Sequence, residues 1–378
     1  MSDTTNEATV PITVPRQASD SDEDPSGYDG EVIHHPDYSV VVPVVSELFT
    51  SNTGVNARRF LQTALALADD NDGQVVLLGI AVVDDETALA DIREYAESDA
   101  EGGGEEQFMP DVVTERQSQL AEVLNVAKGI NQDLPVRAVV RVVADTTQGI
   151  LAAVGGGSET AVVLLRGTGF EEGWLLGTNT IDTVVDGAAC DVFVENVGVP
   201  EGSHALYVPD VEGHTVAPLA ESEAGTIDSI LLPVGTGPHS AIAAEAARAV
   251  ARTLDAVVTV LHVIDPNASG KERSDAMDLL TFAEYILGPD VQSETELREA
   301  SDPTDIIIEE AQNHDFTSIG SPEQKFRLRD LVFKPVQETL VGEKDTTVLM
   351  GRDADRTTRS LYYRYTRAMD DSDTEERP

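Results

Sequence analysis

The order of apolar segments constrains the fold of this chain most strongly, because the same order occurs twice. Runs such as 39–45 and 74–83 are continuously apolar and rich in β-branched residues, which is typical of strands buried on both faces of a parallel sheet. Segments with apolar residues at helical spacing follow them, as at 55–70 and 111–131. Such alternation predicts an α/β fold, an open parallel sheet with helices on both faces.

Each repeat supplies enough strands for a sheet of its own. In the first repeat the predicted strands are 39–45, 74–83, 136–143, 161–165 and 191–197, with helices at 55–70, 111–131, 149–154 and 180–185. In the second repeat they are 228–234, 255–265, 291–297, 316–320 and 346–351, with helices at 240–254, 274–287 and 303–313. Right-handed crossovers fix most of the topology. The sequence therefore predicts two tandem open parallel five-stranded sheets.

The repeats divide the chain into two domains. Domain one is predicted at 38–198 and domain two at 227–352, joined by a linker at 199–226. Residues 1–37 are predicted to be a disordered acidic tail, because their Asp, Glu, Ser, Thr and Pro residues leave little to bury. Residues 353–378 are predicted to be a charged C-terminal tail.

The net charge of the chain is strongly negative. It has 69 acidic and 25 basic side chains, a formal charge of −44, and most of the basic residues are arginines. Such a surface repels itself in dilute buffer, whereas molar salt shortens the Debye length to about 3 Å. We interpret the charge as adaptation to the salt-filled cytoplasm of a halophile, with an ordinary acidic protein as the alternative. The same charge disfavours binding to nucleic acids and anionic membranes.

The sequence also bears on the cellular compartment. The residues after Met1 lack a basic and then apolar leader, and no apolar run approaches about 18 residues. Cys190 is the only cysteine, so no disulfide can form within the chain. We expect a cytoplasmic protein without a membrane span.

Short motifs recur at matching places in the two repeats. The first strand ends in a proline turn, Val41-Val42-Pro43 in one repeat and Leu231-Leu232-Pro233 in the other, and an Ala-rich helix follows. The second strand of the later repeat ends in Leu261-His262-Val263-Ile264-Asp265. In these features and their order, the chain resembles the universal stress protein (UspA-like) family in a tandem arrangement. The resemblance implies the adenine nucleotide alpha hydrolase-like fold for both domains.

The resemblance also implies where a nucleotide would bind. Family members that bind ATP hold adenine with an Asp two residues after the proline, and cradle the phosphates with a glycine-rich loop whose backbone N–H groups approach the oxygens. Here Val45 and Gly235 occupy the Asp position. The loop positions that remain are Gly167, Gly169, Gly177 and Thr178 in domain one and Gly320 and Ser321 in domain two.

Several residues depart from the loop pattern. Arg166 stands at the leading glycine of domain one, and Glu171 and Glu172 would face the phosphates with the wrong sign. In domain two, Glu323 replaces the second glycine, and Phe333-Lys334 replaces the closing Gly-Ser pair. The resemblance therefore implies a degenerate nucleotide site, and we expect no bound cofactor. ATP is the cofactor that an intact site of this family would bind.

A basic cluster lies in the same loop of domain two. It comprises Lys325, Arg327, Arg329 and Lys334. Such clustering would attract an anion, and it predicts a weak site for a nucleotide or polyphosphate or a contact for an acidic partner. Ion pairs with Glu323 and Asp330 are the structural alternative.

The remaining candidates have simpler structural interpretations. Ser240, after His239, is predicted to cap a helix rather than to act as a nucleophile. His262 and Cys190 are predicted to be buried, and Asp84 and Asp265 to cap turns rather than bind a metal or ribose. The Arg/Tyr-rich segment at 352–369 fits either docking onto the acidic surface or single-stranded nucleic acid, and we favour docking. No catalytic or metal-binding set is predicted.

The sequence thus favours a non-catalytic protein of the universal stress type. It would work in stress response or regulation, through contacts with an unknown protein or weak ligand sensing. An ATP- or AMP-binding switch with weak or no ATPase activity is the alternative, and a small nucleotide-hydrolysing enzyme is a more distant one. The apolar last strands, 191–197 and 346–351, predict an intramolecular pseudo-dimer that would cover both sheet edges.

Overall fold

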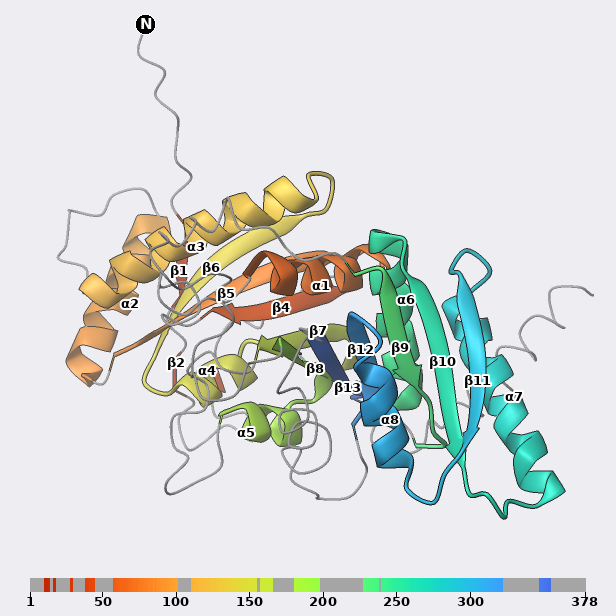
Figure 1. Ribbon diagram of the computed structural model, residues 1–378. Helices are drawn as coiled ribbons and strands as arrows, with labels where there is room; N and C mark the ends of the chain where they lie inside the picture. Colours follow the sequence, from red (N-terminus) through yellow and green to blue (C-terminus); the bar gives the residue numbers. More distant parts are fainter. Residues whose placement is uncertain are drawn as a thin grey trace, which may run out of the picture.

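The predicted α/β repeat is present in a computed structural model of the chain. The structure describes residues 10–13, 16–17, 28–29, 38–44, 57–83, 85–100, 110–154, 157–165, 180–197, 227–237, 239–321 and 347–354. Figure 1 shows two α/β units placed edge to edge, with domain one from red to light green and domain two from green to blue.

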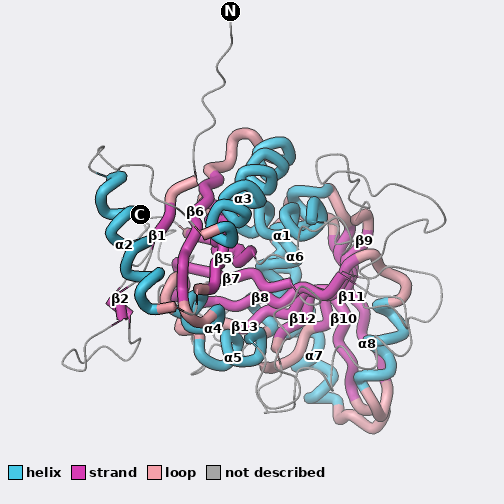
Figure 2. The backbone as a smooth tube through the Cα atoms, turned by 90° about the vertical axis from the view of Figure 1, so that its left-hand side faces the viewer, coloured by secondary structure: helices cyan, strands magenta, loops and turns pink. Residues whose placement is uncertain are grey.

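Domain one is built on five parallel strands. They are β4 (Ser39–Val44), β5 (Gln74–Val82), β6 (Val136–Val143), β7 (Gly157–Leu165) and β8 (Cys190–Val197), in the order β6-β5-β4-β7-β8. The helices are α1 (Ala57–Asp69), α2 (Glu86–Ala100), α3 (Asp111–Ile130), α4 (Thr146–Leu151) and α5 (Thr180–Gly187). Helices α1 and α3 cover one face of the sheet, and α4 and α5 cover the other (Figure 2). The sequence did not predict α2.

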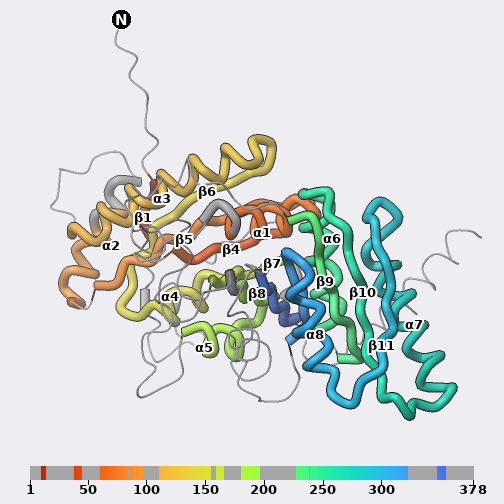
Figure 3. The backbone as a smooth tube through the Cα atoms, in the orientation of Figure 1, coloured from red at the N-terminus to blue at the C-terminus, as the bar shows by residue number. Residues whose placement is uncertain are grey.

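Domain two repeats this order with five parallel strands. They are β9 (Ser229–Pro233), β10 (Val257–Ile264), β11 (Ser293–Glu299), β12 (Phe316–Gly320) and β13 (Thr347–Arg352), in the order β11-β10-β9-β12-β13. The helices are α6 (Ser240–Leu254), α7 (Gly270–Leu287) and α8 (Pro303–Ala311). Helices α6 and α7 lie on one face and α8 on the other (Figure 3). The predicted fold class is confirmed.

The two sheets meet through their last strands. Strand β8 pairs antiparallel with β13, from Val197 opposite Thr347 to Val192 opposite Arg352. This pairing joins the strands of both domains into one eleven-stranded sheet, which the N-terminal strand β1 (Ile12–Thr13) completes. Helices α1 and α6 pack against each other across the junction, so that one apolar core runs through both domains.

The N-terminal segment departs from the predicted disordered tail. Strand β1 pairs parallel with β6, Val10 is 5% exposed, and the Gln117 side chain donates a hydrogen bond to the Val10 carbonyl at 2.7 Å. A further short pair, β2 (Arg16–Gln17) and β3 (Tyr28–Asp29), is antiparallel. The physical reason is that β6 is itself apolar, and Val10 and Ile12 cover its outer edge.

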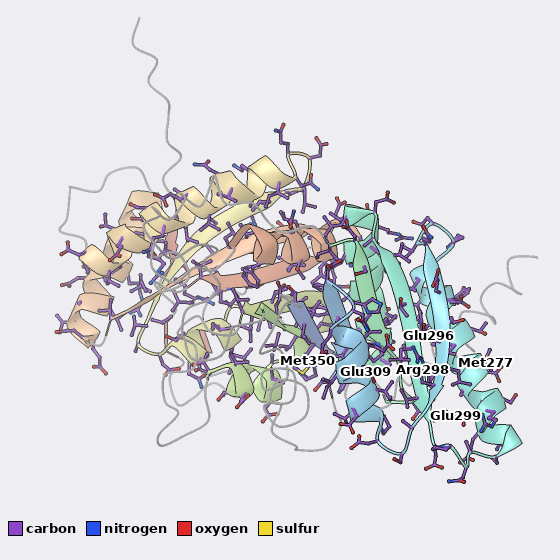
Figure 4. The ribbon with its side chains drawn as sticks, viewed as in Figure 1. Met277, Glu296, Arg298, Glu299, Glu309 and Met350 are labelled. Carbon is purple, nitrogen blue, oxygen red and sulfur yellow. The ribbon has the colours of Figure 1, made fainter. Side chains whose placement is uncertain are left out.

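The opposite edge of the sheet is protected by charge. Strand β11 carries Glu294, Glu296, Arg298 and Glu299. Figure 4 labels the last three on this strand and Glu309 on α8, and Glu299 pairs with Arg273 of α7. Arg298 pairs with Glu296 at 3.0 Å and with Glu310 at 2.7 Å. A charged edge strand discourages the addition of another strand. Among the described residues, no helix is long and apolar enough to cross a membrane.

Candidate ligand-binding edge of domain two

The strand order of domain two reverses between β9 and β12. These neighbours pair only at their first residues, Phe316 with Ile230 and Thr317 with Leu231, although they continue to Gly320 and Pro233. Domain one has the same arrangement between β4 and β7. Open α/β sheets bind ligands at the carboxyl ends of their strands at such a reversal point. We therefore take this edge of domain two as the candidate site.

Helix α6 begins in the space between these strand ends. The backbone of Gly320 lies so close to this helix start that a Cβ atom there would be 2.6 Å from the carbonyl carbon and oxygen of His239 and 2.9 Å from the Ser240 nitrogen. The Ser318 hydroxyl also donates to the Ala243 carbonyl at 2.7 Å. The close approach of the two backbones is therefore enough to require glycine at position 320, and a bound phosphate is not needed to explain it.

The start of α6 differs from the prediction in detail. His239, not Ser240, occupies the N-cap position, and its side chain makes no capping hydrogen bond. Ser240 is the first helical residue, and its Oγ accepts a hydrogen bond from the Gly235 N–H at 3.1 Å. The predicted capping role of Ser240 is thus wrong, because its hydroxyl instead ties the loop after β9 to the helix.

The amide that follows Gly320 is also engaged within the fold. The Ser321 N–H donates to the Gly351 carbonyl at 2.8 Å. Gly235, at the position of the adenine-holding Asp in ATP binders, has open space: a Cβ there would find only Ser240 Oγ, 3.9 Å away. The edge therefore offers room beside Gly235 but no carboxylate at that position.

The other predicted site residues lie outside the described part of the chain. These are Gly167, Gly169, Gly177 and Thr178 of the first loop and Lys325, Arg327, Arg329 and Lys334 of the second. Val45, Asp84 and Trp174 also lie outside it. The structure thus brings together only Gly235, Gly320 and Ser321 of the positions that the resemblance identified.

A buried polar junction next to this edge was not predicted. The Asp353 N–H donates to Nδ1 of His239 at 3.1 Å, and the Ala354 N–H donates to an oxygen of Asp191 at 2.7 Å. Arg352 is 5% exposed and donates to the carbonyls of Ala188 and Cys190. These contacts anchor the end of β13 to both domains. The only signal in the sequence was that arginines begin here in an acidic chain.

Three of the simpler interpretations can be compared with the structure. His262 is half-buried, not buried as predicted, and it hydrogen-bonds the Val234 carbonyl through Nδ1 at 2.7 Å. Asp265 accepts from the Asn267 N–H at 2.7 Å, as a residue that caps a turn does. Cys190 is fully buried, and burial raises the pKa of its thiol to about 12. None of the three has the surroundings of a reactive group, and no cluster of three or more potential metal ligands occurs among the described residues.

Comparison with known proteins identifies this domain. Residues 226–352 match the universal stress protein family. Domain two is a universal stress protein domain. The match ends at residue 352, the last residue of β13, so it spans the whole candidate edge. Domain one lies outside the match and shares the strand order of its neighbour.

Solved structures show likeness at low identity. A universal stress protein from Archaeoglobus fulgidus DSM 4304 is 13% identical over 85% of this chain and 98% of its own, with a TM-score of 0.48. A functionally unknown protein from Pseudomonas aeruginosa PAO1 is 13% identical over 87% and 95%, with a TM-score of 0.42. UspA from Lactobacillus plantarum is 19% identical over 34% and 100%, with a TM-score of 0.26. No curated protein matches the chain.

Proposed function

We propose that this protein is a non-catalytic regulatory protein of the universal stress type. It acts in the cytoplasm of a salt-adapted cell, through protein contacts or weak ligand sensing. Gly235 carries the proposal, because the position that holds adenine in ATP-binding relatives has no carboxylate here. The engaged Ser321 amide and the close backbone contact of Gly320 support it as well.

A second function, an ATP- or AMP-binding switch, has one observation in its favour. The helix start and the strand reversal are retained, and the space beside Gly235 is open. A helix N-terminus favours an anion nearby. On this alternative the protein would bind a nucleotide with other groups and hydrolyse it slowly or not at all.

A thermal shift experiment separates these two functions. The full chain is heated in multimolar KCl with and without Mg²⁺ and millimolar ATP or AMP. A ligand that binds only the native state must raise the melting temperature. We expect no saturable rise for the wild-type protein, and no release of phosphate from ATP during long incubation.

Gly235→Asp provides the matched gain-of-function variant. The new side chain has space, and its carboxylate would restore the adenine-holding group of ATP binders. Gly235→Asn is the control with the same shape and no charge. A saturable rise in the melting temperature of the wild-type protein would contradict the proposal, whereas a rise confined to Gly235→Asp would identify the missing carboxylate as the cause.

A further inference from the structure

Arg141 of domain one is a buried cation that has no counter-ion among the residues that the structure describes. It lies on β6 and is 3% exposed, and its Nη1 atom is buried without a hydrogen-bond partner. Burial lowers the pKa of this guanidinium, and no neighbouring charge contributes to the shift. Because a guanidinium stays protonated in proteins, the charge itself must be accommodated. An unpaired buried charge is costly unless an anion or strong acceptor meets it.

Other arginines of the described chain contrast with Arg141. Arg248 and Arg252 bond to Asp70, Arg273 pairs with Glu299, and Arg298 pairs with two glutamates. The chain carries 69 acidic residues, so that a carboxylate partner would be easy to supply. Among the described residues, nevertheless, none lies beside Arg141. This contrast makes Arg141 the candidate for a counter-ion other than a described side chain.

The surroundings of Arg141 restrict what such a partner can be. In the sheet, Arg141 lies opposite Ile80 of β5 and Thr13 of β1, two residues before β6 ends at the carboxyl edge. Val143, on the same face, packs near Gly149 of α4. Ile80 and Val143 are both nearly fully buried, so the lining is aliphatic on the inner side of Arg141, whereas Thr13 is exposed at the outer side.

The second buried arginine of the domain does not share this place. Arg116 of α3 lies against Gly79, which is opposite Val140 in β6. Since successive strand residues point to opposite faces, Arg116 and Arg141 are on opposite sides of the sheet. Arg116 also bonds Gln119 through Nη1 at 2.8 Å. A single guanidinium therefore faces the aliphatic lining.

We propose that Arg141 holds a small, weakly hydrated monovalent anion of the chloride or bromide type. One buried guanidinium balances one negative charge, and Arg137, the other arginine on this face of β6, is exposed and four residues away. An aliphatic lining favours an anion that loses its water readily and disfavours fluoride or sulfate, which hold their water strongly. The site is independent of the nucleotide question in domain two.

Crystallographic and solution measurements on the full chain test the proposal. Crystals grown or soaked in KBr are measured at the bromine absorption edge, and we expect an anomalous peak beside the Arg141 guanidinium. In parallel, unfolding is measured while KF is replaced by KCl at constant ionic strength. If the dissociation constant is about 0.1 M, raising chloride from about 0.1 to about 1 M increases the folding equilibrium constant about five-fold.

Two variants make the solution test specific. Arg141→Met keeps the length of the side chain and removes its charge, and should abolish the chloride-dependent component. Arg137→Met is the matched control, because Arg137 is an exposed arginine on the same face of β6. Absence of the bromine peak, or an equal chloride response in wild type and Arg141→Met, would overturn the proposal. If Arg141→Met does not fold, the bromine peak alone decides.

Discussion

At the scale of single residues, Gly320 allows the end of β12 to lie directly against the start of α6 at the candidate edge. Gly320→Ala places a Cβ against the His239 backbone, which cannot move aside as a flexible side chain would. We expect a loss of about 1–3 kcal/mol in the free energy of unfolding, measured by chemical denaturation in high salt. Gly129→Ala in α3 is the control, since nothing lies within 4 Å, and should stabilise by about 0.5–1 kcal/mol. Equal effects of the two substitutions would contradict the close contact.

The buried thiol of Cys190 and the partly buried phenol of Tyr38 predict how stability changes at high pH. Burial raises the pKa of Cys190 to about 12, and burial followed by the charge of Asp191 raises that of Tyr38. Both groups ionise at lower pH in the unfolded chain than in the folded protein, so a rise in pH favours the unfolded chain. The free energy of unfolding is therefore unaffected by these groups below about pH 9 and falls above it. Each group contributes about 1.4 kcal/mol per pH unit to this fall. Cys190→Ala should make the fall between pH 9 and 12 shallower in unfolding titrations, and an unchanged slope would contradict the pKa.

Roles set by neighbours in the chain were easier to predict than those set by distant contacts. Asp265 caps the turn two residues ahead, as predicted. Ser269, which was not predicted as a cap, caps α7 in a reciprocal bond with Glu272, three residues away. The role of Ser240 was mistaken, because its partner Gly235 lies outside the helix. The contact of His239 with Asp353 spans 114 residues, and no local pattern reports it.

At the scale of elements, an ion-pair group fixes α1 of domain one against α6 of domain two. Asp70 follows α1, its side chain is 2% exposed, and it accepts from Arg248 at 2.7 Å and Arg252 at 2.6 Å. Arg252 also pairs with Asp290, which is 54% exposed. If the ion pairs are broken, water can solvate the partly exposed guanidinium groups of the arginines. Water cannot reach the buried side chain at position 70 in the same way.

Asp70→Asn should therefore destabilise the protein more than Asp290→Asn. We expect a loss of about 2 kcal/mol for Asp70→Asn and less than about 1 kcal/mol for Asp290→Asn, because exposed ion pairs contribute little. Denaturant titrations at low and high KCl would measure both, and the Asp290 effect should fade at high salt. A larger effect of Asp290→Asn would contradict this account of the interface.

Regular elements were predictable where hydrophobic periodicity was strong. The strand 136–143 and the helix 240–254 have the predicted bounds. Helix α7 ends where predicted, at Leu287, but begins at Gly270, four residues before the predicted start at 274. Helix α2 escaped prediction because its apolar residues are few among acids, although Ile92 is buried. Strand β1 was not predicted because a strand of two residues is too short to show a hydrophobic periodicity. Its structure depends on its pairing with β6.

At the scale of the whole molecule, the repeat explains the shape of the sheet. Each domain alone would expose an apolar last strand, and β8 and β13 cover each other. We propose that this pairing works as an intramolecular pseudo-dimer, in which one chain supplies both halves. The repeated strand order made the fold predictable, whereas much of the candidate site was not, because its loops depart from the family pattern.

Domain two expressed alone tests this proposal. A chain of residues 227–354 would expose the edge of β13 and the alanine-rich face of α6 that meets α1. We expect it to form dimers or aggregates in sedimentation experiments at high salt, while the full chain serves as the control. A stable, well-folded monomer of domain two would show that the junction is dispensable.

We propose that domain two does not bind a nucleotide tightly, and calorimetric titration tests this proposal most directly. Mg²⁺ and ATP are titrated into the full chain in multimolar KCl, and the heat of binding gives affinity and stoichiometry together. We predict no saturable heat, or a dissociation constant no tighter than about 1 mM, which corresponds to about −4 kcal/mol. A one-to-one complex with a dissociation constant near 1 μM, about −8 kcal/mol, would contradict the claim.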